Sequence, residues 1–188
     1  CSCSWHCAAQ RASQSAVGGR VGLGRTAFYP TSGWQLFDAG ELDGVMVIDV
    51  IDEGDVITHF LETPLVAGPV QGRVDWARRF EFMQQHTGQH ILSAAFDTLC
   101  HVRTVSFHLG AAVSTIDLAR EMSAGEIAAA ETEANRVVWE DRPVTIRFAD
   151  ADEAARLPLR KESLRGGMLR LIDMDGFDLS ACGGTHVS

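Results

Sequence analysis

Cysteine is scarce in the body of this 188-residue chain. Three of its five cysteines, Cys1, Cys3 and Cys7, crowd the beginning, and only Cys100 and Cys182 lie further along. Two cysteines so far apart do not form the framework of a disulfide-stapled domain. We therefore expect one of them to be a structural thiol or a metal ligand.

Long apolar runs, a secretory signal and an excess of positive charge are also missing. No stretch approaches the roughly 20 apolar residues that a bilayer-spanning helix needs, and no signal-peptide pattern occurs. Lysine and arginine number 16 against 25 acidic residues, which gives a formal net charge of −9. This balance argues against a general nucleic-acid coat but leaves room for a local basic patch. We predict a cytoplasmic protein with no membrane partner.

The first 20 residues differ from the rest of the chain. They show no apolar alternation and end in a Gly-Gly pair, so we predict an atypical, disordered leader over residues 1–20 and exclude it from the fold prediction. A metal site formed by Cys1, Cys3, His6 and Cys7 is the alternative. Two of these spacings are tighter than those of an ordinary zinc knuckle, which disfavours it.

Residues 21–76 have the composition of a β-rich subdomain. Stretches of β-branched and aromatic residues, among them "RTAFYP" and "DGVMVIDVIDEGDVITHF", alternate with glycine and aspartate turns. Several short strands separated in this way predict a small barrel-like sheet. His59, within this region, is expected at the surface or in a turn.

Near residue 76 the hydrophobic period becomes that of a helix, and residues 77–99 are predicted to form one. Ser123 and Glu126 have the spacing of a capping box that begins a second helix. Strands are predicted in "VRTVSFHLGAAVSTIDL", "RPVTIRFAD" and "GGMLRLIDMDGFDLSACGGTHVS", with a short helix at "ADEAARL". This succession predicts an α+β fold in which residues 77–188 form an α/β sandwich.

Two motifs supply residues that could bind a metal. His86 and His90 of "HTGQH" lie on one face of the predicted helix, although such a pair often occurs by chance. Cys182 and His186 of "CGGTH" flank two glycines that let the turn bend back. Three imidazoles and one thiolate match the number and softness of zinc ligands, so we predict one zinc ion per chain. Thr87 replaces the glutamate base of HExxH metalloproteases, which disfavours protease chemistry.

Five motifs carry a resemblance to a known family. "TAFYPTSGWQLFDAG", "HTGQHILSAAF", "RPV", "LPLRK" and "CGGTHV" occur in the order found in alanyl-tRNA editing proteins of the AlaX type. The chain resembles equally the editing domain of alanyl-tRNA synthetase and, more distantly, that of threonyl-tRNA synthetase. The resemblance covers residues 21–188 and implies the second additional domain of these synthetases, which would carry the zinc site. No aminoacylation domain fits in this length, which favours a free-standing editor.

The resemblance implies an aminoacyl-tRNA hydrolase. Its substrate would be the ester that joins serine or glycine to alanine tRNA, cleaved in trans and without ATP, so mischarged alanine tRNA is the expected partner. Zinc can polarise an ester carbonyl or activate a zinc-bound water. No protein side chain is assigned as the base.

The resemblance also points to residues that bind the substrate. Thr26 is expected to sense the serine hydroxyl and Gln35 to form a polar pocket wall, because a site that hydrogen-bonds a hydroxyl discriminates strongly. Arg160 and Lys161, in "LPLRK", are expected to contact tRNA phosphates, which fix register without reading sequence. The ordinary alternatives are a plain strand residue for Thr26 and a solvated basic face for Arg160 and Lys161.

Two features depart from the family pattern. Trp34 stands where the family usually has glycine, and its indole could narrow the pocket, block the tRNA end or point outward. The chain stops two residues after His186, where family members continue, so the second subdomain is expected to be truncated. A fragment of a synthetase editing domain and a non-catalytic tRNA-binding module stapled by zinc therefore remain as alternatives.

Overall fold

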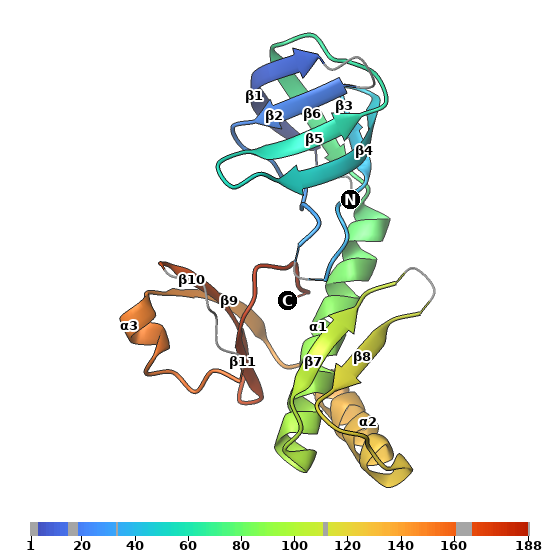
Figure 1. Cartoon of the computed structure of the whole chain (residues 1–188), viewed down its shortest axis with the longest axis vertical. Coiled ribbons are helices and arrows are strands. Elements are labelled where there is room, and N and C mark those ends of the chain that lie inside the picture. The colour runs from blue at the N-terminus through green and yellow to red at the C-terminus, as the bar shows by residue number, and fades with distance from the viewer. Residues whose placement is uncertain (1–3, 15–18, 33, 111–112, 161–166, 188) are drawn as a thin grey trace. The chain divides into compact units, whose positions relative to one another are not determined.

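The computed structural model describes residues 4–14, 19–32, 34–110, 113–160 and 167–187, with the backbone alone for residues 4–14 (Figure 1). The chain forms two compact units, Cys1–Phe82 and Met83–Ser188. The division between them falls within the long helix α1 (Trp76–Cys100). The first unit is built around strands, and the second combines helices with two small sheets.

Six antiparallel strands close a barrel in the first unit. In order around the barrel they are β1 (Ser4–Gln14), β2 (Gly19–Leu23), β5 (Ile57–Leu61), β4 (Val45–Asp52), β3 (Gly40–Leu42) and β6 (Pro69–Val74), and β6 pairs back with β1. Closure removes the open sheet edges that would otherwise offer unpaired backbone groups to other chains.

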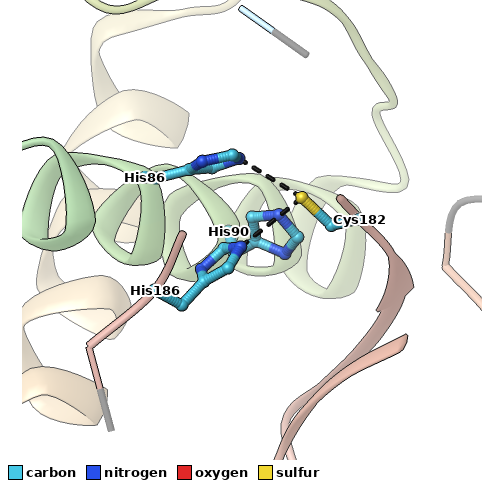
Figure 2. A group of neighbouring side chains, drawn as sticks. All are labelled: His86, His90, Cys182 and His186. Carbon is cyan, nitrogen blue, oxygen red and sulfur yellow. Dashed lines mark hydrogen bonds between the residues drawn. The ribbon is translucent and has the colours of Figure 1, made fainter. Parts of the chain in front are cut away.

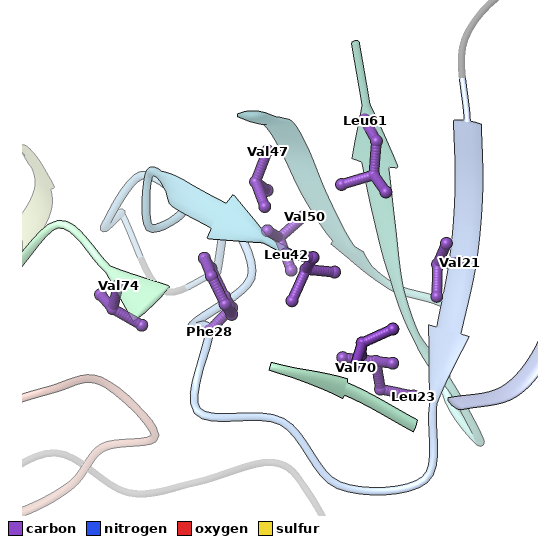
Figure 3. Close-up of a cluster of buried hydrophobic side chains, with 9 residues drawn as sticks. All are labelled: Val21, Leu23, Phe28, Leu42, Val47, Val50, Leu61, Val70 and Val74. Atoms are coloured by element: carbon purple, nitrogen blue, oxygen red, sulfur yellow. The ribbon is translucent and has the colours of Figure 1, made fainter. Parts of the chain in front are cut away.

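Alternating side chains fill the barrel. Every second residue of β6 is buried, as expected for a strand with one face inward. Buried Val47 and Val50 of β4 are three residues apart, because the register shifts between Val47 and Asp49, and a bulge of this kind changes which residues face inward. The core of the barrel (Figure 3) consists of Val21, Leu23, Phe28, Leu42, Val47, Val50, Leu61, Val70 and Val74.

The first strand differs from the predicted disordered leader over residues 1–20. Residues 4–14 form β1, in which Cys7 lies opposite Val70 of β6. Strand pairing uses backbone groups, so a segment without apolar alternation can still close a barrel. The alternative metal site at Cys1, Cys3, His6 and Cys7 falls on side chains outside the described residues.

Residues 25–30, predicted as a strand, belong instead to a loop. The backbone N–H of Tyr29 donates to Oδ2 of the fully buried Asp38 at 2.6 Å, and the N–H of Asp38 donates to the carbonyl of Tyr29 at 3.0 Å. Nε of Arg79 lies 2.8 and 2.9 Å from the two carboxylate oxygens of Asp38. Nη2 of Arg79 donates to the carbonyl of Ala27 at 2.6 Å. A buried ion pair thus fastens the loop where sheet pairing was expected.

The second unit contains two sheets and three helical segments. A β7 (Thr104–His108) and β8 (Thr115–Leu118) hairpin forms one sheet, and the order β11 (Asp178–Ala181), β10 (Leu169–Met174), β9 (Val144–Ala149) forms the other. Both sheets are antiparallel. The described helices are the part of α1 from Met83 onward, α2 (Ala124–Trp139) and α3 (Ala151–Ala154).

The predicted positions of the two longer helices are confirmed. The helix predicted over residues 77–99 spans Trp76–Cys100. Ser123 and Glu126 form the predicted capping box at the start of α2, each side chain bonding the backbone N–H of the other, an arrangement that satisfies two otherwise unpaired donors. Ile91 of α1, Val137 of α2 and Met174 of β10 pack into one apolar cluster.

The α+β class is confirmed by this arrangement of antiparallel sheets and a few helices. The boundaries at residues 20/21 and 76/77, the α/β sandwich and the synthetase-domain type stay predictions. Within the described part of the chain, no helix combines the length and the apolar character that a bilayer crossing requires.

Candidate metal centre

The second unit brings together the four side chains that the sequence singled out. His86 and His90, one turn apart on α1, are 4% and 5% exposed and present rings whose centroids lie 5.4 Å apart. The turn after β11 presents Cys182 and His186 to the same point (Figure 2). Sγ of Cys182 lies 3.4 Å from Nε2 of His86 and 3.4 Å from Nε2 of His186.

One potential ligand atom from each of these residues lies within 4.8 Å of the other three. Two segments about 90 residues apart in sequence therefore converge, as the predicted metal centre required. The donor set also fits zinc, because three imidazoles and one sulfur are the borderline-soft ligands of tetrahedral zinc sites. These four residues could hold a metal ion.

The turn that carries Cys182 and His186 depends on glycine at one of its two positions. A Cβ on Gly184 would lie 2.1 Å from Cε1 of His86, whereas a Cβ on Gly183 would meet no atom within 4 Å. Neither residue has the left-handed backbone conformation that favours glycine. Close approach to the His86 ring, rather than backbone freedom, is therefore the reason for glycine at position 184.

The turn is further held by an arginine from β10. Nη1 of Arg170 donates to the carbonyl oxygens of Cys182 and Gly184 at 2.7 and 2.8 Å. The N–H of Cys182 donates to the carbonyl of Arg170 at 3.1 Å. The backbone of the turn is thus anchored to the neighbouring strand on both sides of Cys182.

Asp178, at the start of β11, is hydrogen-bonded to His90. Its Oδ2 lies 3.0 Å from Nδ1 of His90, and Arg160 contacts both oxygens, with Nε 2.6 Å from Oδ1 and Nη2 3.0 Å from Oδ2. Burial alone would lower the pKa of His90 and raise that of Asp178. Their hydrogen bond, with Arg160 acting on the carboxylate, reverses both effects, so the pKa of His90 is raised and that of Asp178 falls to about 2.

Thr87 supports a second ligand. Its Oγ1 lies 3.2 Å from Nδ1 of His186 and accepts the N–H of Val187 at 3.1 Å. The residue that stands in place of the metalloprotease glutamate therefore contacts the outer nitrogen of a potential ligand. With Nδ1 of both His90 and His186 engaged, Nε2 is the nitrogen that each ring presents to the centre.

The protonation states of Cys182 and His186 suit a metal centre at neutral pH. Burial alone would raise the pKa of Cys182, but hydrogen bonds from His186, His86 and His90 outweigh it and lower the pKa to about 3. Burial lowers the pKa of His186 to about 4. The sulfur is thus a thiolate and the His186 imidazole is neutral, which are the forms that bind metals.

The predicted substrate residues Thr26 and Gln35 belong to the first unit. Oγ1 of Thr26 lies 2.8 Å from Nε2 of His59 and accepts the N–H of Phe28 at 3.0 Å. Gln35 is fully buried, and its backbone N–H and C=O bond those of Ser32. Their roles in substrate binding stay predictions.

His59 corrects the expectation of a surface or turn residue. It is fully buried in β5, with Nδ1 3.3 Å from the carbonyl of Val21 and its ring edge-on to Phe28. The bond with Thr26 engages its other nitrogen. Inward alternation with Leu61, two residues on, was the sequence signal for this burial.

The two predicted tRNA contacts have different outcomes. Lys161 lies outside the described residues. Arg160 is described, and its guanidinium is engaged by Asp178 with a side chain only 15% exposed. Its contact with tRNA stays a prediction. The roles of Asp178 and Arg160 beside His90 were missed, because residues 88 and 18 positions apart carry no local pattern that announces their pairing.

Comparison with known proteins gives this centre a family context. No family model matches the chain. It is 37% identical over 177 residues to "Alanyl-tRNA editing protein Aarsd1" of Danio rerio, covering 92% of this chain and 43% of that protein. The corresponding protein of Mus musculus is 37% identical over 176 residues, with coverage of 91% and 43%. An "Alanine--tRNA ligase" of Pyrococcus abyssi is 36% identical over 191 residues, covering 91% of this chain and 20% of the ligase.

The chain is therefore a homologue of proteins named for alanyl-tRNA editing and of a segment of alanine–tRNA ligases. It is similar in particular to editing proteins of the AlaX type, as its motifs predicted. It spans less than half the length of the editing relatives that it matches.

Proposed function

We propose that this chain is a zinc-dependent aminoacyl-tRNA deacylase that hydrolyses the ester of serine or glycine mischarged onto alanine tRNA, in trans and without ATP. The convergence of His86, His90, Cys182 and His186 on one point is the observation that carries the proposal. The names of the relatives, alanyl-tRNA editing protein and alanine–tRNA ligase, supply the substrate class. A cytoplasmic location and the absence of a membrane partner are part of the proposal.

The four residues would hold zinc through Sγ of Cys182 and one ring nitrogen of each histidine. When bound, zinc supplies a Lewis acid for the ester carbonyl or lowers the pKa of a water. The protein's contribution is orientation. Asp178 and Thr87 fix the outer nitrogens of His90 and His186, and Gly184 makes room for His86.

Thr26 and Gln35 are proposed to select the substrate. The hydroxyl of Thr26 already bonds His59 and Phe28, so its orientation is fixed before a substrate arrives. A hydroxyl in a fixed orientation can form a hydrogen bond with the hydroxyl of serine, which alanine lacks. Arg160 and Lys161 are proposed to contact tRNA phosphates, with Arg160 also engaged by Asp178.

Deacylation by the purified chain tests the proposal. We expect zinc at one ion per chain and rapid hydrolysis of Ser- and Gly-tRNA carrying the alanine tRNA, with Ala-tRNA spared. Cys182→Ala should lose metal and hydrolysis together, because one of four ligands is gone and affinity should fall at least about a hundredfold. Decay of all three substrates at the rate of buffer alone would reject a deacylase.

The second candidate is a tRNA-binding module in which zinc only stabilises the fold. Four protein donors in reach of one ion favour it, because structural zinc sites use four and catalytic ones keep a position open. It predicts tRNA binding without turnover, and unfolding when a chelator removes zinc. The match to 20% of an alanine–tRNA ligase supports a third candidate, a detached part of such an enzyme. DNA sequence on both sides of the coding region would identify it.

A further inference from the structure

Asp178 is a buried carboxylate with several hydrogen-bond donors around it. It is 5% exposed and accepts hydrogen bonds from three side chains, those of His90, Arg160 and Ser180. Ser180 Oγ lies 3.0 and 3.1 Å from its two oxygens. A carboxylate surrounded by donors in this way can only accept hydrogen bonds.

This arrangement determines which nitrogen of His90 carries the proton. Because Asp178 can only accept, Nδ1 of His90 must donate to it across the 3.0 Å contact. The lone pair of the neutral ring then lies on Nε2, the nitrogen that faces the three other ligands. A carboxylate behind a ligating imidazole fixes its tautomer and raises its basicity as a ligand.

Arg160 in turn fixes Asp178. Its Nε and Nη2 contact different oxygens of the same carboxylate, at 2.6 and 3.0 Å, which prevents the carboxylate from rotating away from His90. Behind His186 lies the neutral hydroxyl of Thr87, at 3.2 Å. His90 therefore has a charged partner that is itself held by two hydrogen bonds from Arg160.

We infer that Asp178 and Arg160 form a positioning pair that sets the tautomer and direction of His90 for metal binding. The inference rests on the proposed zinc site and adds two residues to it, neither of which touches the ion. It assigns Arg160 a task inside the protein, whether or not the same side chain also meets tRNA.

A double-mutant cycle tests the pair with zinc alone as the probe. Asp178→Asn leaves Arg160 with one acceptor instead of two and can turn an N–H toward His90, which favours the wrong tautomer. We expect zinc affinity, measured by competition with a chromophoric chelator, to fall 10- to 100-fold. In a His90→Ala background the same substitution should cost less than about threefold, because the residue through which it acts is gone.

The Asp173–Arg147 ion pair provides a matched control. It joins β10 to β9 across 2.9 Å and contacts none of the four potential ligands. Asp173→Asn should leave zinc affinity unchanged. Cobalt(II) spectra give a second readout, since loss of His90 from the coordination sphere should weaken the visible bands in Asp178→Asn but not in Asp173→Asn.

Each outcome decides a separate question. Failure of the wild-type chain to bind zinc would overturn the zinc site itself. Zinc binding by the wild type with an equal loss on Asp178→Asn in both backgrounds, or with no loss, would overturn the positioning pair. Should Asp178→Asn not fold by circular dichroism, Arg160→Gln replaces it in the same cycle, with an expected loss of several-fold that must vanish in His90→Ala.

Discussion

Each of the two units contains a buried aspartate held by an arginine, and the two pairs serve different ends. In the first unit Asp38 receives Arg79 and the backbone N–H of Tyr29. In the second, Asp178 receives Arg160 and the imidazole of His90. Both carboxylates are almost inaccessible to solvent, at 0% and 5% exposure.

The remaining partner separates the two cases. Besides Arg79, Asp38 accepts the backbone N–H of Tyr29, so its ion pair fastens the loop between β2 and β3. Asp178 contacts Nδ1 of His90, and the other nitrogen of that ring faces three potential metal ligands. A buried ion pair is by itself weak evidence of function. The two pairs are distinguished by the third group that the carboxylate contacts.

Replacing Asp38, the buried aspartate of the first unit, should produce the largest loss of stability. Asp38→Ala leaves Arg79 without its partner in a site where its side chain is 15% exposed, and breaking such a pair costs about 3–5 kcal/mol. Urea unfolding should show this loss, while zinc affinity of the folded molecules stays unchanged. Asp52→Ala, which removes an exposed carboxylate bonded to Gly54, should cost less than about 1 kcal/mol. An equal loss in both variants would contradict the comparison.

Adding one carbon in the turn that carries Cys182 and His186 (the metal turn) should lower zinc affinity, which the previous substitution leaves unchanged. Gly184→Ala places a Cβ 2.1 Å from the His86 ring, which must move, and zinc affinity should fall by at least about tenfold. Gly183→Ala adds the same carbon where nothing lies within 4 Å and should bind zinc normally. Chelator competition on the two proteins makes the comparison. Similar affinities for both would show that close approach at position 184 is unimportant.

A smaller effect is expected at Trp34, in the barrel unit. Its φ of 73° lies in the left-handed region, and its side chain is 51% exposed. Trp34→Gly removes a conformational cost of roughly 1–2 kcal/mol, partly offset by a more flexible unfolded chain, so a gain of about 1 kcal/mol is expected. Trp34→Ala keeps the left-handed residue and should bring no such gain. Unfolding midpoints that rise equally in both variants would assign the effect to the indole instead.

The smallest effect should appear only in acid. Burial lowers the pKa of His59 below its usual 6.5, so the unfolded chain takes up the proton first. The stability contributed by neutral His59 is complete above pH 6.5 and is lost as the pH falls from there toward the lowered pKa. His59→Gln should flatten this part of the pH dependence of unfolding. An unchanged slope in His59→Gln would contradict this assignment.

The four potential ligands could be predicted because their signals are local. His86 and His90 share a helix face through their spacing alone, and Cys182 and His186 flank one turn. The capping box at Ser123 is equally local. By contrast, β1 is held by backbone pairing, which requires no recognisable pattern of residues in the sequence. The loop over residues 25–30 is held by Arg79, about 50 residues away.

Burial and partnership of polar residues were the harder part. His59 and Asp178 each lie in a short strand, and no residue nearby in sequence indicates their partners. Such contacts depend on which strands become neighbours, so they follow from the fold and cannot precede it. The residues around the metal centre that were missed are of this kind.

Arg170 gives the metal turn a property that the ligands alone would not provide. By joining the carbonyls of Cys182 and Gly184, it keeps the loop in one shape through contacts that involve no ion. A loop that already has one shape loses little conformational entropy when it binds a cation. The proposed zinc ion would therefore bind to a loop that folding has already ordered.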